Sequence, residues 1–265
     1  MTAIALRLTI RRPDVSLRAL RVWQRNRDVY LRLWKSELVW PLAEPIITLL
    51  ALGIGLGGLV ELPSGERYIE FIAPGLLAVF AMWAAAAECA WGSFFRMENQ
   101  RTFDAIVATP VSIEDVITGE ILWGASRAVI TCAYILVIVS VWGLVDSPLA
   151  ILVLPLAILP GLMFASIALF YTSFARSISF LNYFFAIAII PQFWLGGVFF
   201  PLERLPEEMR VASWFLPITH VVDVYRGLLS GDLRWNHLED IAWLLVVGAL
   251  FYGLALLSMR KRLVK

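Results

Sequence analysis

Residues 148–174 read PLAILVLPLAILPGLMFASIALFYTSF and contain no Asp, Glu, Lys or Arg. A helix needs about 20 consecutive apolar residues to cross the hydrocarbon core of a bilayer, so this stretch is long enough to span one. Because lipid offers no hydrogen-bond partners, a helix, which satisfies its own backbone, is the expected conformation. Similar apolar runs cover residues 38–60, 71–91, 121–145, 178–200 and 241–259. The sequence therefore predicts an all-α integral membrane protein with six transmembrane helices.

The composition of the whole chain is typical of a membrane protein. Of the 265 residues, 60% are hydrophobic and 16% are charged, whereas a soluble domain is about half apolar and a quarter charged. The formal net charge of +1 argues against a surface built to bind nucleic acid or another polyanion. Cys89 and Cys132 lie in apolar runs without metal-ligand or disulfide spacing, so we expect them to pack as small hydrophobic residues.

The basic residues predict the orientation in the membrane. With the N-terminus in the cytoplasm, the cytosolic segments hold sixteen Lys and Arg, and the outer segments hold five. Lys and Arg accumulate in the cytoplasmic loops of membrane proteins, so both termini are expected in the cytoplasm. We expect no cleavable signal peptide, because the first long apolar run is already of spanning length.

Residues 1–37 are expected to form a cytosolic N-terminal segment, and residues 38–265 the transmembrane domain. In the first segment, apolar residues recur at intervals of three and four, with arginines mostly elsewhere around the helix. These apolar residues are Leu20, Trp23, Tyr30, Leu31, Trp34 and Leu38. The pattern predicts a basic amphipathic helix on the cytosolic membrane surface. It serves either as a membrane anchor alone or also as a contact for a cytosolic partner.

The outer segment 201–240 is too long for a turn and too apolar for a solvated loop. Residues 210–215 and 218–229 are typical of short helices, separated by Pro206, Pro217 and Gly231. Neither is long enough to span a bilayer, and apolar stretches of this length beside a membrane suggest re-entrant or interfacial helices. We therefore predict a re-entrant hairpin between the fifth and sixth spans.

The cytosolic loop 92–120 carries a resemblance to a known family. Residues 96–115 read RMENQRTFDAIVATPVSIED, followed by VITGE up to Glu120. This loop resembles that of type-2 ABC exporter permeases, with its charged cluster, small helix, Thr-Pro turn and a Gly near the start of the third span. The outer segment resembles the re-entrant region of that family. The stretches AEPI at 43–46, GIGLG at 53–57 and QRTF at 100–103 are similar to the nodulation-type lipo-oligosaccharide exporter permease.

The resemblance implies a permease subunit of the bacterial inner membrane that exports an amphipathic lipid-linked oligosaccharide or a similar glycolipid. It also implies two copies of the chain working with two ABC ATPase subunits. The chain has no G-x-x-x-x-G-K-[ST] loop, so ATP and Mg are expected on the partner and no cofactor on this chain. Residues 97–110 are the expected coupling helix. Its expected contacts with the ATPase are Glu98, Arg101, Thr102, Phe103, Asp104 and Pro110, with Phe103 anchored in a groove of the partner.

Only three charged residues lie inside the predicted spans, namely Glu44, Glu88 and Arg127. Glu88 and Arg127 lie at matching depth near the cytosolic side, and ionisable groups in a membrane seek partners. We expect an ion pair between them, acting either as a structural brace or in gating. Glu44 is the alternative partner of Arg127, and Pro41 and Pro45 beside it are expected to kink the first span.

Glycines and aromatic residues are the candidates for a substrate passage. Gly53 and Gly57 give the first span a face of small residues, which suits close packing within one subunit, a dimer seam or a passage. In the fifth span, Phe193, Trp194 and Gly196 are expected to line a cleft of low polarity. The aromatic residues of this region also fit an interfacial belt without any other role.

Other functions remain as alternatives at this point. A hydrophobic drug or polyketide exporter shares the expected fold and loop, and a membrane enzyme or a secondary transporter belongs to a different class. H-E-x-x-H and G-x-S-x-G motifs are absent, which argues against the usual membrane proteases and hydrolases. His220 and His237 are the only histidines and have no further metal-ligand pattern beside them, so no metal site is expected.

Overall fold

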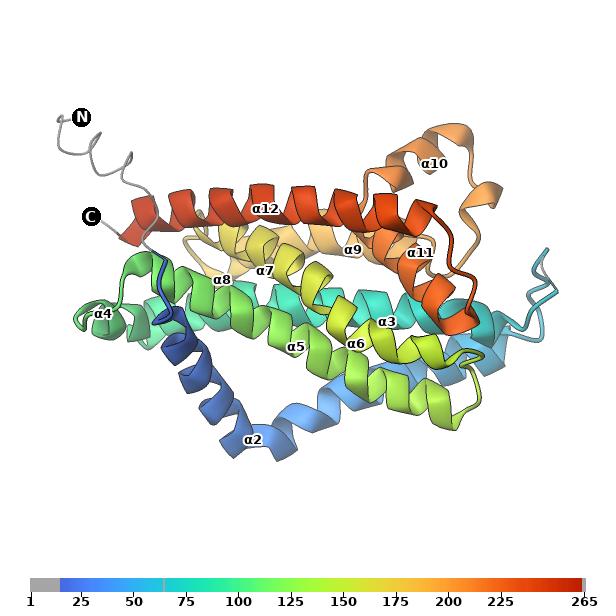
Figure 1. The fold of residues 1–265 in the computed structure, drawn as a ribbon, viewed down its shortest axis with the longest axis horizontal. Helices are drawn as coiled ribbons and strands as arrows, with labels where there is room; N and C mark the ends of the chain where they lie inside the picture. The colour runs from blue at the N-terminus through green and yellow to red at the C-terminus, as the bar shows by residue number, and fades with distance from the viewer. Residues whose placement is uncertain (1–14, 64, 264–265) are drawn as a thin grey trace.

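The computed structural model describes residues 15–63 and 65–263, and every regular element in these ranges is a helix (Figure 1). Residues 1–14 of the expected N-terminal segment lie outside the described residues. The elements, in chain order, are α2 (Ala19–Thr48), η1 (Leu49–Leu56), α3 (Tyr68–Ala87), η2 (Glu88–Gly92), η3 (Phe95–Asn99), α4 (Thr102–Val107), α5 (Ile113–Val141), η4 (Pro148–Leu152), α6 (Val153–Leu156), α7 (Ile158–Thr172), α8 (Ile178–Phe184), η5 (Phe185–Ile189), α9 (Ile190–Leu195), η6 (Leu202–Arg204), α10 (Glu207–Trp214), α11 (Pro217–Ser230) and α12 (Asn236–Leu263).

Five helical runs among the described residues are long and apolar enough to cross a membrane. They are Tyr68–Asn99, Ile113–Val141, Pro148–Thr172, Ile178–Leu195 and Asn236–Leu263. The number rises to six if the bent pair Ala19–Glu37 and Pro41–Leu56 is one span. The two parts of that pair meet at 49°, beside Pro41, whose ring cannot continue the regular hydrogen-bond ladder.

The third long helix begins much earlier than the expected residue 121. Ser112 accepts a hydrogen bond from the Asp115 N–H at 3.0 Å, and Asp115 accepts one in return from the Ser112 N–H, which forms a capping box. The charges that follow are paired inside the protein, with Glu114 Oε1 3.1 Å from Arg260. A search for uncharged runs therefore places the helix start too late.

The helical run Tyr68–Asn99, called the α3 run below, is the centre of the bundle, and most of its length is buried against α5, α7 and α11. Small residues permit this close packing. A Cβ on Gly124 of α5 would lie 2.7 Å from Cys89 Sγ, and one on Gly161 of α7 would lie 2.9 Å from Ala125 Cα. By contrast, α12 and the run from α8 to α9 are exposed over much of their apolar surface.

The N-terminal part of α2 packs on α5 through residues outside the predicted apolar stripe. Ala19, Val22 and Asn26 are buried, and a Cβ on Gly119 would lie 2.6 Å from Val22. Leu20, Leu31 and Trp34 of the expected apolar stripe are exposed. The close contact of Val22 with Gly119 and the hydrogen bond of Asn26 to Glu120 select the buried face, and the exposed members of the apolar stripe remain available to lipid.

The helical bundle has two distinct ends. The start of α2, the small helix α4 and the end of α12 lie at one end, and α10 and α11 lie at the other (Figure 1). The expected short helices at 210–215 and 218–229 correspond to α10 and α11, and both are longer than predicted. Ten residues of α11 are buried in the protein, where it packs on α3 and α12.

Candidate functional site

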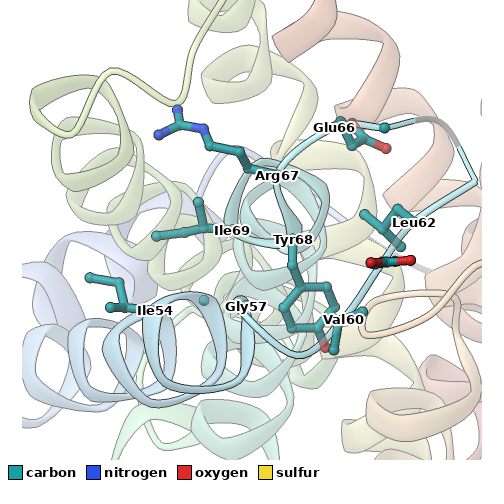
Figure 2. Close-up of a pocket in the computed structure, with 11 residues that line it drawn as sticks. Ile54, Gly57, Val60, Leu62, Glu66, Arg67, Tyr68 and Ile69 are labelled. Atoms are coloured by element: carbon teal, nitrogen blue, oxygen red, sulfur yellow. The ribbon is translucent and has the colours of Figure 1, made fainter.

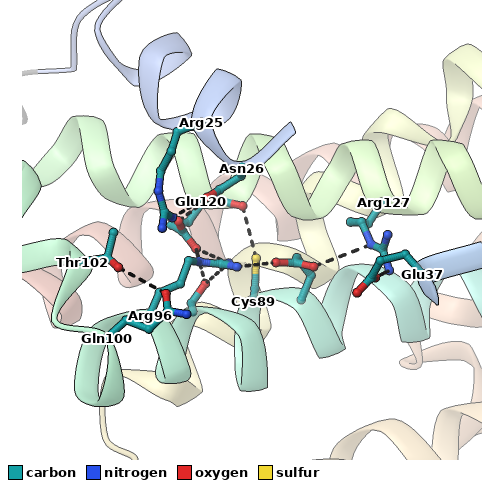
Figure 3. Close-up of polar contacts among 11 residues, drawn as sticks. Arg25, Asn26, Glu37, Cys89, Arg96, Gln100, Thr102, Glu120 and Arg127 are labelled. Atoms are coloured by element: carbon teal, nitrogen blue, oxygen red, sulfur yellow. Dashed lines mark hydrogen bonds and ion pairs between the residues drawn. The ribbon is translucent and has the colours of Figure 1, made fainter. Parts of the chain in front are cut away.

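A buried polar network joins α2, the end of the α3 run and α5 (Figure 3). At its centre, the Arg96 guanidinium lies 2.8 Å from Glu88 Oε1 and 2.5 Å from Glu120 Oε2. Glu120 also accepts hydrogen bonds from Ser93 Oγ at 2.6 Å and from Asn26 Nδ2 at 2.8 Å. Because the Glu120 side chain is only 1% exposed, its charge is stabilised by these donors rather than by water.

Arg127 extends the network along α5. Its guanidinium lies 3.0 Å from Glu37 Oε2 and 3.6 Å from Glu88 Oε2, and it stacks over the Tyr30 ring at 4.6 Å. The structure thus brings together Glu88 and Arg127, the residues of the expected pair, and adds Glu37 as a nearer acid. Glu44, the alternative partner, lies exposed on α2 beyond the bend. Glu88 therefore lies between two arginines, Arg96 and Arg127.

Sequence reasoning missed the members of this network that lie outside the predicted spans, namely Asn26, Glu37, Arg96 and Glu120. The sequence does contain one indication that Arg96 belongs to this network. Glu88 and Arg96 are eight residues apart, a spacing that places two side chains on the same face of a helix. The expected end of the second span at residue 91 hid this relationship, because the helical run continues to Asn99.

The loop between the α3 run and α5 carries α4 at the end of the bundle. Arg101 has a φ of 51°, an uncommon backbone conformation for a residue other than glycine, and it turns the chain into α4. Glu98, Arg101, Asp104 and Pro110 are exposed, and Thr102 is half-buried. These residues form an accessible polar surface at the α4 end of the molecule.

Phe103 is buried in this chain, whereas the sequence predicts that it projects into a groove of the ATPase. Its side chain is only 1% exposed and packs in this chain's own core, so it cannot also fill a groove in a partner. In an amphipathic helix as short as α4, one large apolar residue has to hold the helix on the bundle, and Phe103 has this role. The exposed polar residues of the loop are therefore the candidate contact surface.

Three contacts tie the α4 loop and the helix ends on either side of it to distant parts of the chain. Glu98 pairs with Arg262 near the end of α12 at 2.8 Å. The Arg18 guanidinium donates to the carbonyl of Pro110, and Asp115 accepts from the Ser16 N–H at 2.6 Å. The loop is therefore linked to the helices at both ends of the chain.

A cavity of about 590 Å³ lies at the opposite end, between η1 and the start of α3 (Figure 2). Gly53 and Gly57 line it, together with the polar side chains of Glu66 and Arg67. A side-chain hydrogen bond from Arg67 to Glu70 raises the pKa of Arg67 from its ordinary value. A Cβ on Gly53 would lie 2.6 Å from Ile69 Cγ1, so this glycine also permits the close approach of η1 to α3.

The aromatic candidates of α9 form one cluster. The Phe193 ring lies 5.3 Å from Trp194 and 5.2 Å from Phe199, measured between centroids. Trp194 is 52% exposed and Phe193 is half-buried. Gly196 is buried, and a Cβ there would lie 2.2 Å from Ile218 Cγ2 of α11. The structure therefore assigns Gly196 a packing contact, and only Trp194 of these residues is freely accessible.

A bundle of apolar helices long enough to cross a membrane, with a buried ionic network and an accessible polar loop at one end, is typical of the membrane subunit of a transporter. The chain belongs to the ABC-2 type transporter family, whose model matches residues 19–229. It is 32% identical to Nodulation protein J of Rhizobium leguminosarum bv. trifolii over 253 residues, which cover 96% of this chain and 97% of that protein.

Two further relatives support the same assignment. Nodulation protein J of Rhizobium meliloti (strain 1021) is 34% identical over 80% of each chain. The Inner membrane transport permease YadH of Escherichia coli (strain K12) is 24% identical over 77% of this chain and 80% of its own. The chain is therefore an integral membrane transport subunit, as its family and its apolar helices both indicate.

Proposed function

We propose that this chain is the permease subunit of an ATP-driven exporter that moves an amphipathic lipid-linked oligosaccharide, or a similar glycolipid, out of the cytoplasm. The similarity to Nodulation protein J over almost the full length of both chains carries this proposal. In this account, two copies of the chain work with two copies of a separate ABC ATPase, which holds ATP and Mg.

The proposed contact with the ATPase is the α4 loop. Its exposed residues include a basic and an acidic side chain, Arg101 and Asp104, which suit a charged partner surface. Because the loop contacts the start of α2 through Pro110 and Arg18, and Glu98 beside it pairs with Arg262 of α12, a displacement of α4 would reach both helices. The ionic network around Arg96 lies directly behind it and would brace the ends of α3 and α5.

The proposal includes an orientation and a passage. The α4 end faces the cytoplasm, the bent α2 with η1 is the first of six spans, and α10 and α11 form a re-entrant hairpin at the outer face. An amphiphile can keep its acyl part in lipid while its polar head crosses, so the passage is proposed to open laterally beside η1 and α9. Exposed apolar side chains such as Ile54 and Trp194 support this location.

Co-purification followed by an ATPase assay tests the proposal. The chain extracted from its native membrane is expected to retain an ABC ATPase, and lipid-linked oligosaccharide is expected to stimulate ATP hydrolysis. A hydrophobic drug of matched size serves as the comparison substrate. Stimulation by the drug and not by the glycolipid would favour the alternative exporter class, and an intact chain with no associated ATPase would contradict the proposal.

A further inference from the structure

His220 lies at the centre of a buried contact between the helices α10, α11 and α12. The ring is on α11, its Nδ1 is 2.7 Å from Asp240 Oδ1 of α12, and its Nε2 is 2.8 Å from the carbonyl oxygen of Trp214, the last residue of α10. The His220 side chain is 5% exposed, so water cannot replace either contact. One ring therefore fastens α10 and α11 to α12.

The two neighbours of the ring place a requirement on its protons. A carbonyl oxygen and an ionised carboxylate are both acceptors, whereas a neutral imidazole has a single N–H. Beside an ionised Asp240, both short contacts can be hydrogen bonds only if the ring carries a proton on each nitrogen and is an imidazolium. A neutral ring beside an ionised Asp240 has a proton for only one of the two contacts. If the proton is on Nδ1, the lone pair of Nε2 faces the Trp214 carbonyl oxygen; if it is on Nε2, the lone pair of Nδ1 faces the Asp240 carboxylate.

The surroundings of the ring favour the charged form. The face of Trp243 stacks on it, with 4.4 Å between centroids and 25° between planes, and an aromatic face attracts a cation. Asp223, one turn further along α11, is a second acid that acts on this site, and the basic group nearest to it is Arg226, which lies 4.0 Å from Asp223. His237 of α12 is a further titratable group that acts on Asp223.

His237 provides an internal contrast. Its Nδ1 accepts a hydrogen bond from the backbone N–H of Arg234 at 3.1 Å, so that nitrogen has to be unprotonated. The two histidines therefore differ in their contacts: one ring nitrogen of His237 accepts from a backbone N–H, whereas both ring nitrogens of His220 face oxygen atoms.

We propose that His220 and Asp240 form a proton-dependent latch that holds α10 against α11 and α12 while the imidazolium is intact and loosens α10 when the imidazolium loses a proton. The latched form binds one proton more than the released form, so the latch strengthens as the pH falls and weakens as the pH rises. His220 is a positioning residue in this proposal, since it acts on the helices of the hairpin. The proposal rests on the described contacts alone and does not depend on the substrate of the transporter.

Nitrogen NMR of the full chain with labelled histidine, in lipid nanodiscs, tests the protonation directly. The chain contains only two histidines, and H237Q assigns their signals. At pH 6, the end of the range at which the latch is expected to be formed, His220 is expected to show two protonated ring nitrogens. A neutral His220 there would overturn the proposal.

Hydrogen exchange of residues 207–216, expressed as a protection factor, tests the latch. Between pH 6 and pH 9 the native chain is expected to lose about tenfold protection in α10, the factor that one hydrogen bond of ordinary strength represents. In D240N, the amide can donate to a neutral Nδ1 while Nε2–H still donates to Trp214, so protection is expected to be retained and independent of pH. D223N removes the same charge from the neighbouring acid without removing a bond to the ring, and it is expected to keep the pH dependence.

Two outcomes would overturn the latch. One is a pH-independent protection of α10 in the native chain, and the other is a pH dependence in D240N equal to that of the native chain. If D240N fails to fold, the NMR result and the native pH profile still decide the proposal.

Discussion

Arg96 and Glu120 form an ion pair, 2.5 Å between Nη2 and Oε2, that joins the end of the α3 run to the first part of α5. The carboxylate is 1% exposed and the guanidinium side chain 14% exposed, so both charges are removed from water. A buried pair of this kind contributes little net stability, but loss of one partner leaves an uncompensated charge. The pair therefore fixes how these two helices meet directly behind the α4 loop.

The first prediction concerns this pair. Glu120→Ala should destabilise the chain by about 3–5 kcal/mol, because it leaves Arg96 buried with one acid fewer. Glu120→Gln should cost less, since the amide oxygen can still accept from Asn26 or Ser93. Thermal unfolding in nanodiscs measures both, and R96Q combined with E120Q should cost less than the sum of the single changes. Strict additivity would show that the two side chains do not interact.

The second prediction concerns Arg127, which has two acidic neighbours. Double-mutant cycles should give a larger coupling energy for Arg127 with Glu37, at 3.0 Å, than with Glu88, at 3.6 Å. Arg127→Leu paired with Glu37→Gln and with Glu88→Gln supplies the two cycles, read by thermal unfolding. A coupling with Glu88 alone would contradict the contacts described here.

The third prediction separates the surface of the α4 loop from its support. Reversal of an exposed charge, in R101E or D104K, should reduce association with the ATPase and leave the melting temperature of the permease unchanged. F103A should lower stability by about 3–5 kcal/mol, because it removes a buried ring from the core. E208K, an exposed reversal on α10 at the other end of the molecule, is the matched control for the charge changes. Normal ATPase binding in both R101E and D104K would remove the loop from the interface.

The fourth prediction concerns the contact of Gly196 with Ile218. A methyl group at position 196 would lie 2.2 Å from Ile218 Cγ2, so Gly196→Ala should destabilise the packing of α9 on α11. Shortening the opposing side chain in G196A/I218A should recover part of that loss. Thermal unfolding of the single and double variants provides the comparison. Equal stability of G196A and the native chain would mean that α9 and α11 are not in close contact.

The sequence was most informative where one physical constraint dominates. The apolar run at 148–174 corresponds closely to the helical run Pro148–Thr172, because the need to satisfy the backbone in lipid decides its structure. The two short helices of the outer segment were also predicted, since Pro206, Pro217 and Gly231 mark their ends. At Gly231 the backbone has a φ of 82°, which suits a glycine at the end of α11.

The sequence-based predictions that are wrong share a different cause. The prediction places the ends of helices at charged residues. Glu120 and Arg96 instead lie inside helical runs, because each is paired with a charged residue on another element. The partner of a buried charge depends on how helices far apart in the sequence pack, and a single sequence does not contain that information. Phe103 was misplaced for the same reason, since an aromatic residue in a polar loop suits either a partner's groove or the chain's own core.

ATP-driven export in reconstituted vesicles tests the central claim most directly. The permease and its ATPase are placed together in proteoliposomes, with the ATPase facing the outside, and labelled lipid-linked oligosaccharide is supplied in the outer leaflet. The account predicts that adding ATP and Mg moves the labelled headgroup into the protected inner leaflet, and that D104K, but not E208K, reduces this movement. Movement of the headgroup without ATP, or an active ATPase complex that leaves the glycolipid in place, would contradict the account.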